Sequence, residues 1–280
     1  MILFNTTAGP VVQHESAHFA LPGVTWEQLV NTDDLAGELA SRIDAGSARQ
    51  VPAPADAALL PPIGDRQELW AAGVTYYRSR TARMEEADTS GGGGASFYDK
   101  VYHAERPELF MKATPHRCVG TGQAMHLRRD SKWMVPEPEL TLVVTRRGKI
   151  IGYTIGNDLS CRDIEGENPL YLPQAKTFDR CAALGPGILV SDQPLPATTA
   201  IKVEILRGGQ SMFAGATDLS QLKKSPSQLV SYLFRDNAFP HGVLLLTGTG
   251  VVPPNDFTLR SGDVVRIEID GIGTLVNAME

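Results

Sequence analysis

Apolar residues near the start of the chain recur at the spacing of one helical face. The residues that share this spacing are Leu29, Leu35, Leu39 and Ile43. Because positions three or four apart lie on the same side of a helix, the pattern predicts a helix from Trp26 to Ile43. A proline-rich stretch follows at residues 51–62, where no regular element is expected. We therefore predict a small N-terminal domain, residues 1–65.

From Trp70 onward the apolar residues form short runs separated by glycine and proline, which is typical of β-strands. The strands predicted in this way include Leu140–Thr145, Ile150–Ile155, Gly187–Ser191, Ile201–Leu206, Val243–Thr247 and Val264–Ile269. A helix is predicted at Ser225–Phe234, with Ser225 as its N-cap and Pro226 in its first turn. The pattern predicts an α+β protein, mainly β, with a second and larger domain at residues 66–280.

The amino-acid composition argues against several classes of function. Hydrophobic residues make up 42% and charged residues 21% of the chain, which is typical of a globular protein. No run approaches the roughly 18 apolar residues of a membrane span, and the first residues lack a signal-peptide pattern. A cytoplasmic protein without membrane association is therefore expected. The net charge of −6 and the scattered basic residues argue against nucleic acid as a partner.

The three cysteines, Cys118, Cys161 and Cys181, show no C-x-x-C spacing. Structural zinc and a disulfide framework are both poorly supported by this pattern. Cys161 lies near the acidic residues described next but has no evident histidine base. We expect it to be a buried structural thiol, since free cysteine is usually packed in the interior.

Two β-type runs on either side of Arg147-Gly148 predict a hairpin that brings three carboxylates together. Glycine in the second loop position suits a two-residue turn of type I′. With that turn, Glu137 lies opposite Asp158. Side chains two apart on a strand share a face, so Glu139 projects to the same side as Glu137. Directly opposed residues have Cβ atoms only about 4.5–5.5 Å apart.

Three carboxylates this close raise the pKa values of one another unless a cation lies between them. Hard oxygen ligands suit Mg²⁺ or Mn²⁺, and Ca²⁺ is a further alternative. We therefore predict that Glu137, Glu139 and Asp158 bind a divalent metal. The alternative is a solvated acidic strand end, which accounts for each glutamate separately but gives no reason for Asp158 to join them.

These residues and several further segments resemble the fumarylacetoacetate hydrolase family. The segments that carry the resemblance are Glu137–Glu139, Gly152–Asp163, Gln174–Asp179, Leu246–Gly250 and Gly262–Leu275. The resemblance extends over about residues 68–278. It implies a mixed β-sandwich roll, a divalent cation held by three carboxylates, and a homodimer or homotetramer.

The family's hydrolytic members carry a histidine soon after an Asn-Tyr pair. In the matching stretch of this chain, Gly73–Arg80, Ser79 stands at the histidine position. A serine hydroxyl is not a base near pH 7, so this departure argues against hydrolysis. We expect Ser79, Arg80 and Thr249 to contact the substrate, since Thr249 lies in a Thr-Gly-Thr-Gly stretch that offers hydroxyl and amide donors.

The resemblance also implies two catalytic residues. Lys176 matches the family's active-site lysine and is expected to bind the substrate carboxylate or to steady an enolate oxygen. The segments Arg106–Pro115 and Glu165–Lys176 look closest to a subgroup of sugar-acid dehydratases. In that subgroup the glutamate that matches Glu108 is the base.

The function implied is Mg²⁺-dependent dehydration of 2-keto-3-deoxy-D-arabinonate, the same compound as 2-keto-3-deoxy-D-xylonate, to 2,5-dioxopentanoate in pentose catabolism. A family hydrolase that cleaves a carbon–carbon bond in an acylpyruvate or a diketo sugar acid is the first alternative. A metal-binding protein without catalytic activity is the second. The absence of a histidine at position 79 favours the dehydratase over the hydrolase.

Overall fold

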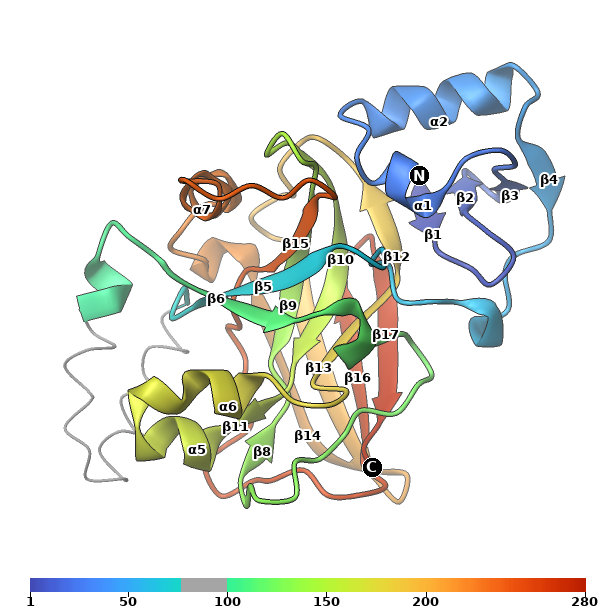
Figure 1. Ribbon diagram of the computed structural model, residues 1–280. Coiled ribbons are helices and arrows are strands. Elements are labelled where there is room, and N and C mark those ends of the chain that lie inside the picture. The colour runs from blue at the N-terminus through green and yellow to red at the C-terminus, as the bar shows by residue number, and fades with distance from the viewer. Residues whose placement is uncertain (77–99) are drawn as a thin grey trace.

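Two β-sheets face each other around one apolar core (Figure 1). The computed structural model describes residues 1–76 and 100–280. Its strand pairs are both parallel and antiparallel, and short helices lie at the edges of the sheets. This architecture confirms the predicted α+β, mainly β fold and its mixed β-sandwich. Within the described residues, no helix has both the length and the apolar character needed to cross a bilayer.

The larger sheet has 11 strands and holds the centre of the fold. In spatial order its strands are β4 (Arg49–Val51), β3 (Ala17–Ala20), β2 (Val11–His14), β1 (Ile2–Phe4), β12 (Ala182–Val190), β10 (Ile150–Asp158), β9 (Pro138–Val144), β15 (Val243–Leu246), β5 (Glu68–Gly73) and β6 (Glu108–Ala113), with β7 (Cys118–Val119) paired to β12. All residues of β9 and β15 are buried. Strands covered on both faces read as continuous apolar runs, which is why β15 appears as four consecutive apolar residues in the sequence.

The smaller sheet packs on β9, β10 and β12 of the larger one. Its strands, in spatial order, are β14 (Gln210–Asp218), β13 (Ala200–Arg207), β16 (Val264–Ile269) and β17 (Gly273–Ala278). Along β13, Ile201, Val203 and Ile205 are buried and alternate with less buried residues, as expected for a sheet with one face on the core. A separate two-stranded ladder joins β8 (Met134–Val135) to β11 (Ser160–Cys161).

Helices are short and lie at the edges of the two sheets. The α-helices named in the described residues are α1 (Trp26–Leu29), α2 (Leu35–Asp44), α5 (Arg162–Glu167), α6 (Leu172–Lys176) and α7 (Pro226–Leu233). The 3-10 turns are η1 (Asp56–Ala58), η2 (Pro115–Arg117), η3 (Pro169–Tyr171) and η4 (Leu219–Gln221). The N-cap prediction for α7 is confirmed, because the Ser225 hydroxyl accepts a hydrogen bond from the Gln228 amide at 3.2 Å.

The single helix predicted at residues 26–43 is wrong, because the chain breaks it into α1 and α2. The linking residues carry short polar side chains with partners outside a helix. Asn31 accepts a hydrogen bond from the Arg146 amide at 3.0 Å, and Asp34 caps α2 by accepting from the Gly37 amide at 3.1 Å. The predicted apolar face is nevertheless buried, with Leu29, Leu35 and Leu39 in the core.

The N-terminal strands continue the larger sheet. Strand β1 pairs antiparallel with β12, where Ile2 lies opposite Leu189, and β2, β3 and β4 follow outward from β1. Figure 1 shows these blue strands and helices α1 and α2 grouped beside the yellow β12. The boundary near residue 65, between a small N-terminal domain and a catalytic domain, stays a prediction.

The register of the β9–β10 hairpin agrees with the prediction at its open end. Glu139 lies opposite Gly156, and the Asp158 amide donates to the Glu137 carbonyl oxygen at 3.0 Å. Glu137 and Glu139 therefore project beside Asp158 from the same face of the sheet. The ladder ends at the pair of Asn157 and Pro138.

The predicted two-residue turn of this hairpin is wrong. The Gly148 amide bonds to the Thr145 carbonyl oxygen, and the Thr145 amide bonds to the Lys149 carbonyl oxygen, so three residues form the loop. Gly148 adopts φ +77°, as in a type I turn followed by a left-handed residue. A β-bulge between Ile150 and Gly152 takes up the extra residue. The extra residue in the turn and the extra residue in the bulge offset each other. Residue pairing toward the open end of the hairpin is therefore the predicted one.

Gly156 generates a prediction about this hairpin. A Cβ atom at this position would lie 2.2 Å from the Leu246 Cδ2 atom and 2.4 Å from the Thr141 Oγ1 atom. Overpacking of this kind costs about 1–3 kcal/mol, so Gly156→Ala is expected to lower the free energy of unfolding by that amount in urea denaturation. Gly64→Ala is the control, because its nearest atoms lie at 3.4 Å. Equal stability of the two variants would contradict this packing.

Candidate metal centre and active site

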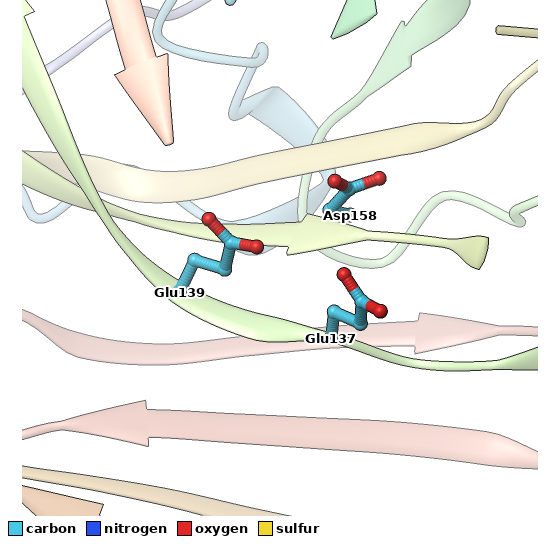
Figure 2. A group of neighbouring side chains, drawn as sticks. All are labelled: Glu137, Glu139 and Asp158. Carbon is cyan, nitrogen blue, oxygen red and sulfur yellow. The ribbon is translucent and has the colours of Figure 1, made fainter. Parts of the chain in front are cut away.

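Glu137, Glu139 and Asp158 form a buried group at the open end of the β9–β10 hairpin, here called the carboxylate triad. One carboxylate oxygen from each residue lies within 4.8 Å of the others, and no triad residue is more than 5% exposed. Figure 2 shows the three carboxylates turned toward one another. The backbone causes this, because Glu137 and Glu139 are two residues apart and Asp158 is opposite Glu137.

Glu139 is the triad member with the least compensation from neighbouring charges. Burial raises the pKa of its carboxyl well above the ordinary value, and the charges of Asp158 and Glu137 raise it further. Lys176 and the Gly248 amide, which donates to Oε2 at 2.6 Å, act in the opposite direction. A cation among the triad would favour the ionised form of this carboxyl.

Asp158 is held by two buried lysines. Its Oδ1 atom lies 2.7 Å from the Lys112 Nζ atom, and its Oδ2 atom lies 3.2 Å from the Lys176 Nζ atom. Burial acts to raise the pKa of Asp158, but these two ammonium groups outweigh it and hold the pKa below its usual value. The Asp158 carboxyl is therefore ionised in the folded protein at neutral pH.

Lys112 is a site residue that the sequence analysis missed. It is completely buried, and its ammonium group donates to the carbonyl oxygens of Leu159, at 2.9 Å, and of Lys176. The ion pair with Asp158 places a third oxygen atom beside the same ammonium group. A faint signal exists in the sequence, since Lys112 interrupts an apolar stretch and lies two and four residues after Phe110 and Glu108, on the same face of β6.

Lys176, at the end of α6, reaches the triad as expected. Its Nζ atom lies 2.7 Å from the Glu137 Oε2 atom, and it also donates to the Ser160 hydroxyl. Arg162, the first residue of α5, contacts the other Glu137 oxygen at 2.9 Å. Both oxygens of Glu137 therefore face buried cations.

Thr249 lines a small pocket together with the carboxylate triad. Gly73, Phe110 and Lys176 line the same pocket. Its hydroxyl donates to the Val251 carbonyl oxygen at 3.0 Å. The stretch reaches the triad through the backbone, because it is the Gly248 amide that binds Glu139. Substrate binding by Thr249 stays a prediction.

Glu108 lies beside the pocket, opposite Gly73 on the neighbouring strand β5. A Cβ atom on Gly73 would be only 1.9 Å from the Glu108 Oε2 atom, so the glutamate side chain lies directly over the glycine backbone. Gly73 and Phe110 line the pocket, and Glu108 shares a strand face with Phe110. The described geometry is compatible with a proton-transfer role for Glu108, which stays a prediction.

Ser79 and Arg80, the two other predicted substrate contacts, lie outside the described residues. All three cysteines are free and buried. Burial raises the pKa of Cys161 to about 12, so its thiol is protonated at neutral pH. The interpretation of Cys161 as a structural thiol agrees with this environment.

The donor set of the triad fits a hard divalent cation. It consists of carboxylate oxygens, and the described residues that line the pocket include neither histidine nor cysteine. Such oxygen donors suit Mg²⁺, Mn²⁺ or Ca²⁺ better than zinc. The pKa of Glu139 agrees with this fit, because burial first and then the charges of Asp158 and Glu137 raise it, and a bound cation would act against both effects.

The mixed β-sandwich and the buried carboxylate triad together indicate that this chain is one of the proteins with a divalent-metal centre in the sandwich. Comparison of the sequence with family models identifies the family. The model described as fumarylacetoacetate (FAA) hydrolase C-terminal matches residues 77–280. The chain belongs to the fumarylacetoacetate hydrolase family, as the sequence motifs predicted.

Several similar proteins are named as dehydratases. A probable 2-keto-3-deoxyxylonate dehydratase of Haloferax volcanii is 49% identical over 216 residues, which cover 77% of this chain and 73% of the relative. The 2-dehydro-3-deoxy-D-arabinonate dehydratase of Saccharolobus solfataricus is 44% identical over 226 residues, covering 80% and 75%. A solved structure of 2-keto-3-deoxy-D-arabinonate dehydratase complexed with magnesium and 2,5-dioxopentanoate has a TM-score of 0.82 at 34% identity, covering 100% of this chain and 99% of the other.

The position of Lys112 generates a prediction about stability. In Lys112→Met, Asp158 and two backbone carbonyls lose a buried cationic partner. Breaking a buried ion pair in this way costs about 3–5 kcal/mol, and urea denaturation is expected to show a loss of that size.

Lys202→Met is the matched control for this experiment. Lys202 also pairs with two acidic residues, Glu268 at 3.0 Å and Asp270 at 3.2 Å, but its side chain is 49% exposed. Water screens such pairs, so the free energy of unfolding is expected to change little. Similar losses in both variants would contradict a special role for Lys112 in the site.

Proposed function

We propose that this chain dehydrates 2-keto-3-deoxy-D-arabinonate to 2,5-dioxopentanoate in a Mg²⁺-dependent reaction. The observation that carries the proposal is the buried carboxylate triad, with Lys176 and the face of β6 beside it. The substrate follows from the dehydratases that cover most of this chain at 44–49% identity. Magnesium follows from the donor set and from the solved complex of the similar dehydratase.

The proposed chemistry begins at C3 of the substrate, next to the C2 carbonyl. When bound, the divalent cation supplies a Lewis acid that draws electrons from this carbonyl and makes the C3 protons more acidic. Glu108 accepts one C3 proton, and the hydroxyl group leaves from C4, so that one molecule of water is lost and a C3=C4 double bond forms. A proton then leaves C5 and a proton is added at C3, which moves the double bond to C4=C5 and gives an enol. Transfer of the enol proton to C4 gives the C5 aldehyde of the product.

The described residues support separate roles for the two lysines. The Lys112 ammonium faces the Asp158 carboxylate and two backbone carbonyl oxygens, and Lys112 is not among the described residues that line the pocket. Lys176 does line the pocket, where its ammonium donates to the side chains of Glu137, Asp158 and Ser160. We infer that Lys176 provides the fixed positive charge for the substrate carboxylate or for the developing enolate oxygen.

The direct test is a mass balance with purified protein. Incubation with 2-keto-3-deoxy-D-arabinonate and Mg²⁺ is expected to give 2,5-dioxopentanoate in equal molar amount, measured by chromatography and mass spectrometry. Chelation with EDTA is expected to abolish turnover, and added Mg²⁺ to restore it. Release of pyruvate from an acylpyruvate, without conversion of the sugar acid, would instead identify a family hydrolase. Mg²⁺ binding without turnover of either compound would leave a metal-binding protein.

Substitution of Glu108 tests the proposed base. Glu108→Gln is expected to lower kcat by about 10²–10⁴-fold, as loss of a general base does, while Mg²⁺ affinity stays unchanged in isothermal titration calorimetry. Glu105→Gln is the control, because this exposed carboxylate accepts from the Tyr232 hydroxyl and does not line the pocket.

Glu137→Gln serves as the contrasting variant. Loss of a triad carboxylate is expected to weaken Mg²⁺ binding at least about tenfold. If Glu108→Gln rather than Glu137→Gln weakened Mg²⁺ binding, the two roles would be wrongly assigned.

We further propose a cytoplasmic homodimer or homotetramer, which rests on family membership. Size-exclusion chromatography with light scattering distinguishes these two assemblies from a monomer. We expect the partner to be the small sugar acid, with no role for nucleic acid.

A further inference from the structure

One triad carboxylate, Glu139, is held by a backbone group from outside the β9–β10 hairpin. The Gly248 amide donates to its Oε2 atom at 2.6 Å. Gly248 lies just beyond the end of β15, which lies between β9 and β5 in the larger sheet. The preceding residue, Thr247, is tied to β9, because its amide and its hydroxyl donate to the Leu140 carbonyl oxygen at 3.0 and 2.9 Å. The contact with Glu139 therefore depends on how the peptide group between Thr247 and Gly248 is oriented.

Thr75, just beyond the end of β5, binds the other side of this peptide group. Its hydroxyl donates to the Thr247 carbonyl oxygen at 2.6 Å. A trans peptide group is planar, and its C=O and N–H bonds point in opposite directions. The Thr247 carbonyl and the Gly248 amide belong to one trans peptide group, so Thr75 and Glu139 hold it from two sides.

Two unusual backbone conformations accompany this contact. Val74, which lines the pocket and is 3% exposed, adopts φ +53°, a region that β-branched residues rarely enter. Gly248 adopts φ +95°, and a Cβ atom there would lie 1.9 Å from the Thr75 Oγ1 atom. Strain such as that at Val74 persists only where the surrounding structure imposes it. The corner at Val74 turns the completely buried Thr75 toward a glycine that leaves room for its hydroxyl.

We propose that Thr75 is a positioning residue for the metal site. Its hydroxyl fixes the peptide group between Thr247 and Gly248, and the Gly248 amide in turn fixes the Glu139 carboxylate beside the other two triad members. A carboxylate held in this way loses less conformational freedom when it binds a cation, so the affinity for the cation is higher. Thr75 acts through Glu139 and needs no contact with the metal or the substrate. The inference rests on the metal site of the proposed function and extends it.

Thr75→Val tests this role, because it replaces the hydroxyl by a methyl group of similar size. We expect the dissociation constant for Mg²⁺, measured by isothermal titration calorimetry on the folded protein without substrate, to rise about 10–100-fold, as it does when groups behind metal ligands are changed. Thr75→Ser retains the hydroxyl and is expected to bind Mg²⁺ like the wild-type protein. If Thr75→Val does not fold, Thr75→Ala removes the hydroxyl without placing a methyl group against Gly248, and the same rise is expected.

Thr154→Val is the matched control. Thr154 is also completely buried in the larger sheet, and its hydroxyl donates to the Gly187 carbonyl oxygen at 2.8 Å. Neither Thr154 nor Gly187 is among the described residues that line the pocket. We expect this variant to lose stability as Thr75→Val does, because both lose one buried hydrogen bond, but to keep wild-type affinity for Mg²⁺.

The outcomes separate this inference from the proposed function. If the folded variants without the Thr75 hydroxyl bind Mg²⁺ like the wild-type protein, whatever their melting temperatures, Thr75 is only structural and the inference is wrong. An equal loss of affinity in Thr75→Ser or in Thr154→Val would also overturn it. In these cases Mg²⁺ binding and turnover by the wild-type protein still support the proposed function. If the wild-type protein itself binds no Mg²⁺, the metal site of the proposed function fails, and the role of Thr75 fails with it.

Discussion

Repulsion between carboxylates is the constraint around which this site is organised. Three acidic side chains within 4.8 Å of one another, shielded from water, are stable only if their charges are compensated. The compensation is uneven. Asp158 and Glu137 each face two buried cations, whereas Glu139 has one backbone amide and the more distant charge of Lys176. The electrostatic demand for a metal is therefore greatest at Glu139.

The compensating groups come from segments far apart in the chain. Lys112 lies on β6, Arg162 on α5 and Lys176 on α6, while the triad lies on the β9–β10 hairpin. The charges of the carboxylates are therefore compensated only when the sandwich folds and brings these cations to the triad. A hairpin formed early, without its neighbours, would hold three uncompensated carboxylates. The same interactions that stabilise the folded chain thus prepare the metal site.

The fold class and the grouping of the three triad residues could be predicted from the sequence, because both depend on short-range patterns. Short apolar runs bounded by glycine and proline predicted β9, β10 and β13, and the proximity of Glu137 to Asp158 needed only a hairpin register. The register was right although the turn was wrong, because the bulge after Ile150 compensates for the longer loop. That loop is held from a distance, since Asn31 binds the Arg146 amide, and no local pattern contains this contact.

The residues that sequence reasoning did not predict are those whose role depends on long-range contacts. A single lysine in an apolar strand has no visible partner until β6 and Asp158 are brought together, and this is the case of Lys112. Thr75 was noticed only as part of a family segment, because Thr247 becomes its neighbour through the pairing of β5 with β15. Similarly, the break between α1 and α2 follows from contacts with the β9–β10 loop.

The pairing of β1 with β12 has a consequence for how the protein avoids aggregation through strand edges. A bare strand edge is a template for another chain, and β12 would present one beside the strand that carries Asp158. Strands β1 to β4 move that edge outward, where the sheet ends at the three-residue strand β4 with exposed Arg49 and Gln50. A short, charged edge is a poor template. The N-terminal strands thus act as a cap against aggregation, and removing them would expose the flank of the catalytic sheet.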